Sequence, residues 1–363
     1  MRILIIALSG IGDALLFTPA ATLIRKHFPN IKMDALVMFG GARELYEQTS
    51  LFDNVIYHDF LRSSLIKSLG VVSKLRGKYD ASINVYPSNR LEYNVIQFLI
   101  GAKRRAAAKY LRQDLPQLGF LNNVRMLEND LLHNVDENIR LSEKLLGFSA
   151  DDEPDIFLPL PEQAIELAGK YLKETGVGEN DLVIGFHAGS AIFKNQIKRR
   201  WEPNKFAELA RLLIAKHSAW ILLFGGPDES GLKREIGTLS GSGRVLIPPT
   251  GSIIQSAALM KRCNVMVTND SGMMHLASAT KTPTVAIIGP TNTNYIHPWH
   301  TEYEIASLYL DCAPCFIYSP RPLTCIRSDM KFKCIKELTV EAVYANVIHL
   351  LSRIPAAKNR INA

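Results

Sequence analysis

The stretch Thr268-Asn-Asp-Ser-Gly-Met-Met-His-Leu-Ala-Ser-Ala279 follows an apolar run at residues 263–267 and precedes a second one at residues 284–288. This order predicts a buried strand, a polar turn, an amphipathic helix and another buried strand, which is the repeating unit of a parallel α/β sheet. Asp270, Ser271, Gly272 and His275 fall where the first strand passes into the helix N-terminus. Backbone N–H groups and the positive end of the helix dipole point outward there, so the stretch predicts an anion site, such as one for a nucleotide diphosphate.

The composition is that of a globular protein, with 47% hydrophobic and 21% charged residues. A chain of 363 residues is long enough for two domains, each with its own core. The net charge of +7 favours phosphorylated or otherwise acidic partners. No basic cluster rich in aromatic residues accompanies this charge, so we do not expect nucleic-acid binding.

The N-terminal apolar run could be mistaken for a signal peptide. It ends at Ser9-Gly10, and no small-residue cleavage site follows it. No apolar run approaches the roughly 18–20 residues that a membrane span needs. We therefore expect a cytoplasmic protein, for which peripheral contact with the inner membrane stays open.

Short apolar runs alternate with helical patterns along the whole chain. Strands are expected at residues 3–8, 33–38, 79–85, 182–186, 220–224, 245–247, 265–267 and 284–288, with helices at 14–27 and 162–175. A proline-rich acidic segment at residues 151–161 separates the two halves. The pattern predicts two doubly wound, Rossmann-like domains, residues 1–160 and 161–363, facing each other across a cleft. In such sheets ligands bind beyond the carboxyl ends of the strands.

Gly10-Ile-Gly12-Asp13 joins the first strand to the first helix. It is a poor dinucleotide fingerprint, because the third glycine would fall at Leu15, and it lacks a P-loop lysine. The turn presents one carboxylate at the mouth of the expected cleft. Asp13 is either a helix cap or a general base that the helix dipole keeps ionised.

Three more segments at strand ends carry candidate ligand contacts. His187-Ala-Gly-Ser190 is a small-residue loop, and Lys198-Arg199-Arg200 precedes a helix from Pro203, where cations suit phosphate oxygens. Asp228 or Glu229 could contact a ribose. The alternatives are a solvated basic loop, an ordinary turn and, for His275, a packing role in place of a pyrophosphate contact.

Four cysteines form a separate cluster at Cys312, Cys315, Cys325 and Cys334. The spacing C-x2-C-x9-C-x8-C favours a structural Zn or Fe site with no open position for catalysis. Two disulfides or four free thiols are the alternatives. Cys263 lies apart and is expected to be a small buried hydrophobe.

Taken together, these residues resemble glycosyltransferase family 9, the ADP-heptose:lipopolysaccharide heptosyltransferases and their relatives. The resemblance runs over most of the chain. Its motifs are Gly12-Asp13, Thr18-Pro19, Arg25, Pro29, His187-Ala-Gly-Ser190, Arg199-Arg200-Trp201, Phe206-Ala-Glu-Leu-Ala210, Asp270-Ser-Gly-Met-Met-His275, Thr282-Pro-Thr284 and Gly289-Pro-Thr291.

The resemblance implies a GT-B fold and inverting transfer without a catalytic metal, with the acceptor on the N-terminal domain and the sugar nucleotide on the C-terminal one. Asp13 would be the catalytic base, and Lys198 or Arg199 would supply the catalytic cation, which is usually lysine in the family. Asp270, Ser271, Gly272 and His275 would hold the donor diphosphate, with Ser190 nearby. From the sequence itself, Arg200, Asp228 and Glu229 are further candidate donor contacts, and Gly12 and the basic run Lys103, Arg104 and Arg105 are candidate acceptor contacts. The four-cysteine segment also resembles one found in some relatives, including autotransporter heptosyltransferases that bind iron.

The expected function is transfer of a heptose or related sugar from an ADP-sugar to a lipid-linked, phosphorylated saccharide such as a lipopolysaccharide core. A nicotinamide-dependent oxidoreductase on paired Rossmann domains is one alternative. A nucleotide-binding protein without catalysis is the other, because fold alone does not establish function.

Overall fold

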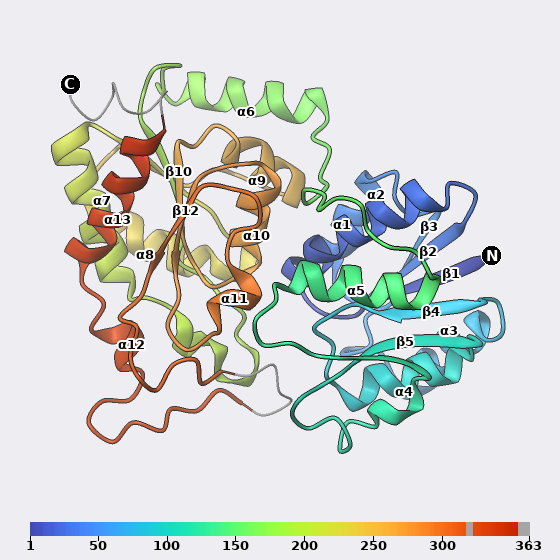
Figure 1. The fold of residues 1–363 in the computed structure, drawn as a ribbon. Helices are drawn as coiled ribbons and strands as arrows, with labels where there is room; N and C mark the ends of the chain where they lie inside the picture. The colour runs from blue at the N-terminus through green and yellow to red at the C-terminus, as the bar shows by residue number, and fades with distance from the viewer. Residues whose placement is uncertain (317–321, 355–363) are drawn as a thin grey trace. The chain divides into compact units, whose positions relative to one another are not determined.

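The computed structural model describes residues 1–316 and 322–354 (Figure 1). The chain divides into two compact units: most of the first is Met1–Pro159, and the second begins at Leu160. Each unit contains one six-stranded sheet. Within the described residues, no helix combines the length and the apolar character that crossing a membrane requires.

The first unit is built on a continuous apolar strand, β1, with the sequence RILIIA. Burial on both faces of a parallel sheet favours such runs over alternating ones. Helices α1, α2 and α5 cover one face of the sheet, and α3 and α4 cover the other (Figure 1). The strands are β1 (Arg2–Ala7), β2 (Lys32–Val37), β3 (Asn54–Tyr57), β4 (Ala81–Asn84), β5 (Arg104–Lys109) and β6 (Val124–Leu127). The helices are α1 (Ile11–His27), α2 (Gly40–Gln48), α3 (Leu65–Leu75), α4 (Leu91–Ile100), the 3₁₀ turn η1 (Gly119–Leu121) and α5 (Asn134–Leu146).

The second unit repeats this plan around a core that contains the fully buried Trp201 and Phe206. The strands are β7 (Val183–His187), β8 (Trp220–Leu223), β9 (Val245–Leu246), β10 (Val265–Asn269), β11 (Thr284–Ile287) and β12 (Tyr303–Ala306). The helices are α6 (Glu162–Glu174), α7 (Pro203–His217), α8 (Ser230–Ser240), α9 (Ile253–Met260), α10 (Gly272–Ala279), α11 (Thr293–Ile296), α12 (Lys333–Lys336) and α13 (Val340–Arg353), with 3₁₀ turns η2 (Phe193–Arg199) and η3 (Pro227–Glu229).

The two sheets share one topology. Their strand orders are β3-β2-β1-β4-β5-β6 and β12-β11-β10-β7-β8-β9, and numbering each sheet from its own first strand gives 3-2-1-4-5-6 in both. In this order the direction of winding reverses between the first and fourth strands, and ligands bind beyond the carboxyl ends of the strands at that point. The switch points therefore lie between β1 and β4 in the first unit, and between β7 and β10 in the second.

Most of the predicted elements are present, with shifted ends. Helix α1 begins at Ile11, three residues before the predicted start, and the strand predicted at residues 79–85 is shortened to β4. The prediction missed β3, β5, β6 and β12. β3 and β12 are edge strands with partly exposed residues, and β5 begins and ends with basic side chains, so none of the three forms a long apolar run.

Candidate functional site

The switch point of the second unit is held by Asn269, the last residue of β10. Its side-chain Oδ1 accepts a hydrogen bond from the Trp201 backbone N–H (3.0 Å), and its Nδ2 donates to the Ala188 carbonyl (2.7 Å). Asn269 is completely buried. One amide therefore fixes the loops that follow β7 and η2 against the end of β10.

Arg199 and Asp270 form a buried ion pair at this position, with Nη1 and Oδ2 2.5 Å apart. The same Oδ2 accepts a hydrogen bond from the Thr291 hydroxyl (2.5 Å), and Nη2 of Arg199 donates to Gln196 (2.7 Å). The guanidinium also lies over the Phe316 ring, 5.0 Å from its centroid. Because an arginine buried in this way loses little further entropy on binding, it is preorganised for a second anion.

Arg199 retains one unused donor. Its Nε is buried and has no hydrogen-bond partner among the described residues. A buried donor that stays unsatisfied costs about 1–3 kcal/mol, so a ligand oxygen at this position would be stabilised. The neighbouring Lys198 is exposed. Of the two cations considered from the sequence, the structure thus places Arg199 beside Asp270.

Helix α10 begins here without a side-chain cap. Ser271 is its N-cap residue, but the Ser271 hydroxyl makes no capping hydrogen bond. Instead its Oγ lies 3.0 Å from Nδ1 of His187. The first turn, starting at Gly272, therefore keeps N–H groups that can bind an anion, as the sequence pattern of this turn predicts.

Glu229 lies on the other side of the His187 ring, with Oε2 3.1 Å from Nε2. The Gly226 N–H also donates to this carboxylate (3.2 Å), and Arg200 lies 3.8 Å from it. Burial opposes ionisation of Glu229, but these partners outweigh it, and its pKa lies below the usual value. Asp228 is exposed. Of the two carboxylates considered for a ribose contact, only Glu229 is therefore part of this cluster.

Ser190 and Arg200 bring the loop after β7 to the same cluster. Arg200 Nε donates to the Ser190 hydroxyl (3.2 Å), and Nη2 donates to the Ser190 carbonyl. The Ser190 hydroxyl also lies 3.2 Å from the Gln196 carbonyl. Ser190 is therefore held by the two ends of the basic loop, close to the residues that orient Arg199.

His275 is buried in the first turns of α10, and its Nδ1 has no hydrogen-bond partner among the described residues. Burial lowers its pKa to about 4, although the nearby Asp270 acts in the opposite direction. His275 is therefore a neutral imidazole at neutral pH. It can offer a ligand a hydrogen bond but no positive charge.

Asp13 lies at the switch point of the first unit, in the first turn of α1, and is half-buried. Buried tyrosines surround the turn: Tyr93 donates to the Leu8 carbonyl (2.7 Å), and Tyr46 donates to the Ala14 carbonyl (3.0 Å). Burial, with the Asp13 charge as one of the smaller contributions, raises the pKa of Tyr93 to about 12. Gly12 is buried beside Asp13.

The basic run Lys103, Arg104 and Arg105 lies at the opposite edge of this sheet. Arg104 opens β5 and pairs with Ala81, the first residue of β4, so the run is at the amino ends of the strands. Arg105 uses its guanidinium on the carbonyls of Leu121 (3.0 Å) and Ala102 (2.8 Å). The structure therefore does not bring the run together with Asp13, which follows the carboxyl end of β1.

Three other arginines follow carboxyl ends in the first unit. Arg62 comes after β3, Arg90 after β4 and Arg112 after β5. Arg90 lies over the Tyr93 ring (5.6 Å), and Arg112 pairs with Asp130 at 3.5 Å. Sequence reasoning did not select these residues. The only feature of the sequence that could have identified them is their position just after a strand. Two of these strands, β3 and β5, were not predicted.

Comparison with known proteins now decides between the alternatives. Residues 68–322 match the family model described as glycosyltransferase family 9 (heptosyltransferase). The chain belongs to this family. It is 29% identical over 324 residues to lipooligosaccharide heptosyltransferase 2 of Haemophilus ducreyi, covering 85% of this chain and 89% of that protein.

Solved structures agree on the fold. ADP-heptose lps heptosyltransferase II of E. coli aligns with a TM-score of 0.72 at 19% identity, covering 96% of this chain and 98% of the other. E. coli heptosyltransferase WaaC with ADP aligns with a TM-score of 0.68 at 20% identity over the full length of both chains. The predicted GT-B fold is confirmed, and the protein is a glycosyltransferase. The oxidoreductase alternative is not supported.

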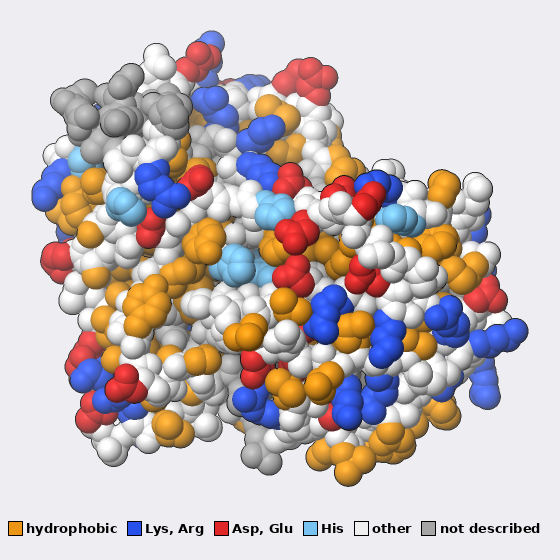
Figure 2. Space-filling model, viewed as in Figure 1, with side chains coloured by type: hydrophobic (Ala, Val, Ile, Leu, Met, Phe, Trp, Pro, Cys, Tyr) orange, Lys and Arg blue, Asp and Glu red, His pale blue; other side chains and the backbone are white. Residues whose placement is uncertain are grey.

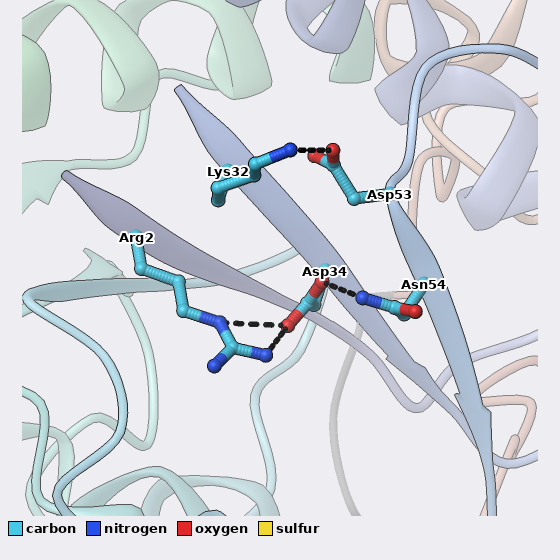
Figure 3. A pocket seen from close by; sticks show the side chains of 5 residues that line it. All are labelled: Arg2, Lys32, Asp34, Asp53 and Asn54. Atoms are coloured by element: carbon cyan, nitrogen blue, oxygen red, sulfur yellow. Dashed lines mark hydrogen bonds and ion pairs between the residues drawn. The ribbon is translucent and has the colours of Figure 1, made fainter. Parts of the chain in front are cut away.

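A separate pocket of about 400 Å³ lies at the amino edge of the first sheet (Figure 3). Arg2 and Asn54 point toward Asp34 there, at 2.6 and 2.8 Å, and Lys32 points toward Asp53 at 3.2 Å. These charged groups are bound to one another. They join the starts of β1, β2 and β3, at the edge opposite Asp13, which indicates a structural role.

The predicted metal site is not supported. All five cysteines lie among the described residues and are free, which also leaves the disulfide alternative without support. Burial raises the pKa of Cys334 to about 11, and the other three thiols of the segment contribute, so the four lie within electrostatic range. Yet the described residues contain no group of three or more His, Cys, Asp or Glu side chains arranged to hold a metal ion.

Proposed function

We propose that this enzyme transfers a heptose from an ADP-heptose donor to a phosphorylated saccharide of a lipopolysaccharide inner core. The observation that carries the proposal is the buried pair of Arg199 and Asp270 beside the uncapped start of α10. Support for the donor and the acceptor comes from the names of the relatives, which are lipooligosaccharide and ADP-heptose heptosyltransferases.

In this proposal the second unit holds the donor. The diphosphate lies against the first turn of α10 at Ser271 and Gly272, within reach of the unused Nε of Arg199 and of the neutral His275. The carboxylate of Glu229 receives the ribose hydroxyls. Ser190 and Arg200 complete the site by holding the loop after β7 in place.

The reaction is a single displacement at the anomeric carbon. Asp13 takes the proton of the acceptor hydroxyl as its oxygen forms the new bond to the anomeric carbon. The bond from that carbon to the diphosphate oxygen breaks, and its electron pair leaves with ADP. Arg199 and the N–H groups of α10 stabilise the negative charge that develops on the diphosphate. One base and one stabilised leaving group suffice, and the configuration inverts.

On the acceptor side, we infer that Arg90 and Arg112 contact acceptor phosphates, because they follow the carboxyl ends of β4 and β5 at the edge where Asp13 lies. Arginine suits phosphate because its planar fork can donate two hydrogen bonds at once. Lys103, Arg104 and Arg105 would act only through long-range attraction from the amino edge. A lipid-linked acceptor also implies that the enzyme works at a membrane surface, which we propose is the cytoplasmic face of the inner membrane.

The Asp13→Asn variant tests the proposal. It keeps the size of the side chain but removes the base, so we expect transfer to fall at least about 100-fold while the Kd for ADP stays unchanged. The matched control is Glu92→Gln, which alters another carboxylate in the first turn of a helix of the same unit. Full transfer activity in Asp13→Asn would show that the base is wrongly assigned. Failure of ADP to bind the wild-type protein would instead reject the donor site.

A further inference from the structure

Helix α3 carries large apolar side chains that the fold leaves uncovered. Leu65 is 74% exposed, Ile66 83% and Leu69 47%, and Leu61 just before the helix is also exposed. Val72 and Leu75 of the same helix are buried in the core of the first unit. Helix α3 therefore packs on the core through Val72 and Leu75, and its exposed apolar residues take no part in that packing.

These exposed residues form one face. At 100° per residue, positions 65, 66 and 69 fall within one sector of about 100°, and Lys67 and Lys74 lie about 80 to 100° outside it, on the polar side of the helix. This is the pattern of a helix that lies in the plane of a membrane interface.

The surrounding charge is mostly positive. Residues 60–78 contain five Lys or Arg, namely Arg62, Lys67, Lys74, Arg76 and Lys78, and no Asp or Glu. The Arg62 side chain is 91% exposed, and its contact with Asp59, at 4.0 Å, is long. Hydrophobic and basic side chains are interspersed over the lower right of Figure 2, where α3 and α4 lie in Figure 1. A basic and apolar surface complements anionic lipid headgroups better than a neutral or basic partner.

We propose that the outer face of α3, with Leu61, Leu65, Ile66 and Leu69 at its centre and Arg62, Lys67 and Lys74 around it, docks on an anionic phospholipid surface. The apolar side chains enter the boundary between headgroups and acyl chains, and the cations bind phosphate groups.

The role that we give to this docking surface rests on the proposed function. Helix α3 follows the carboxyl end of β3, and Asp13 follows the carboxyl end of β1 in the same parallel sheet. The N-terminal end of α3, where Leu65 and Ile66 lie, is therefore on the edge of the first unit that carries the proposed base. A membrane bound there presents lipid-linked acceptors to that edge.

Co-sedimentation of the full chain with vesicles tests the surface. We expect binding to vesicles that contain phosphatidylglycerol and much weaker binding to phosphatidylcholine alone. Leu65→Gln with Ile66→Gln should weaken binding to the anionic vesicles at least about tenfold. Lys67→Glu with Lys74→Glu should weaken it about fivefold or more for each charge. Ile165→Gln with Leu167→Gln, which alters two exposed apolar residues of α6, is the matched control and should bind like the wild type.

Equal binding to both vesicle types, or unchanged binding by both α3 variants, would overturn the proposal. So would a stable dimer of the wild type that the apolar variant dissociates, because the face would then serve a second copy of the chain. Transfer to a delipidated acceptor is measured in parallel. Its absence in the wild type, with vesicle binding intact, would reject the proposed function and leave the docking surface standing.

Discussion

The imidazole of His187 is hydrogen-bonded to the carboxylate of Glu229, with Nε2 and Oε2 3.1 Å apart. The other ring nitrogen lies 3.0 Å from the hydroxyl of Ser271, so one ring joins the proposed ribose contact to the proposed diphosphate contact. The ionised carboxylate can only accept, so Nε2 of His187 donates to it. Nδ1 of the same ring is then the atom that meets the Ser271 hydroxyl. We infer that His187 positions both groups.

Gly189 leaves room for this carboxylate. A Cβ at Gly189 would overlap Oε1 of Glu229, so the carboxylate would have to leave its place beside His187. We predict that Gly189→Ala weakens ADP binding about tenfold, through loss of the ribose contact. Isothermal titration with ADP measures the effect.

Gly226→Ala is the matched control for this experiment. Gly226 also contacts Glu229, through its N–H, which alanine keeps. A Cβ at Gly226 would meet nothing within 4 Å, and its φ of −68° is open to any residue. This variant should bind ADP like the wild type. Equal losses in both variants would mean that the loop, and not the carboxylate, determines affinity.

Two replacements of His187 separate its two contacts. Glutamine can place an amide near the position of Nε2 and keep the bond to Glu229, whereas asparagine can reach only the position of Nδ1, next to Ser271. We predict that His187→Asn raises the Kd for ADP about tenfold. His187→Gln should keep the Kd within about threefold and lower kcat, because the Ser271 hydroxyl is no longer held. Steady-state kinetics and titration together give this division, and identical effects of the two variants would contradict it.

The donor turn was predictable from the sequence because the chemistry and the local structure coincide there. An apolar strand, the polar Asp270 and Ser271, and a helix signal suffice to place an anion site without knowledge of the tertiary structure. The pairing of Arg199 with Asp270 was not predictable in this way. It depends on the pairing of β7 with β10, two strands that are neighbours in the sheet but far apart in the sequence.

The basic run from Lys103 to Arg105 shows the opposite case. Its charge suggested a phosphate contact, but charge does not say at which end of a strand a residue lies. The small and basic residues of β5 gave no strand signal, so the direction of the strand, and with it the edge, stayed unknown. A recognised β5 would have directed attention to Arg112, beyond its carboxyl end.

The amino edge of the first sheet should matter for stability alone. Asp34 is buried and accepts hydrogen bonds from Arg2 (2.6 Å), Asn54 (2.8 Å) and the Tyr79 hydroxyl (2.9 Å). Asp34→Ala leaves these donors without their acceptor, and we expect a loss of about 2–3 kcal/mol in the stability of the first unit. Lys32→Met, which breaks an exposed pair with Asp53, should cost less than about 1 kcal/mol. Thermal melts measure both effects, and a changed Kd for ADP in Asp34→Ala would argue against a purely structural role.

The pH dependence of stability should differ between the two units. Burial lowers the pKa of His275 from 6.5 to about 4. Between these two pH values the unfolded chain therefore binds a proton at His275 that the folded chain does not bind. The contribution of His275 to the free energy of unfolding is therefore fully present above pH 6.5. It is lost as the pH falls toward 4, by roughly 3 kcal/mol in total. Burial raises the pKa of Glu137 in the first unit from 4.5 to about 7, which gives the opposite sign. Its contribution is complete below pH 4.5 and is lost as the pH rises toward 7.

Two variants isolate these contributions in melts recorded from pH 4 to pH 7. His275→Gln should flatten the fall in melting temperature on acidification, because glutamine does not titrate. Glu137→Gln should remove a loss of stability on the approach to pH 7 and leave the acid side unchanged. If His275→Gln showed the same slope as the wild type, the folded imidazole would bind its proton at the same pH as the unfolded one. It would then be a second cation beside Asp270 at acidic pH, in addition to Arg199, and the diphosphate would face a charge where we expect only a hydrogen bond.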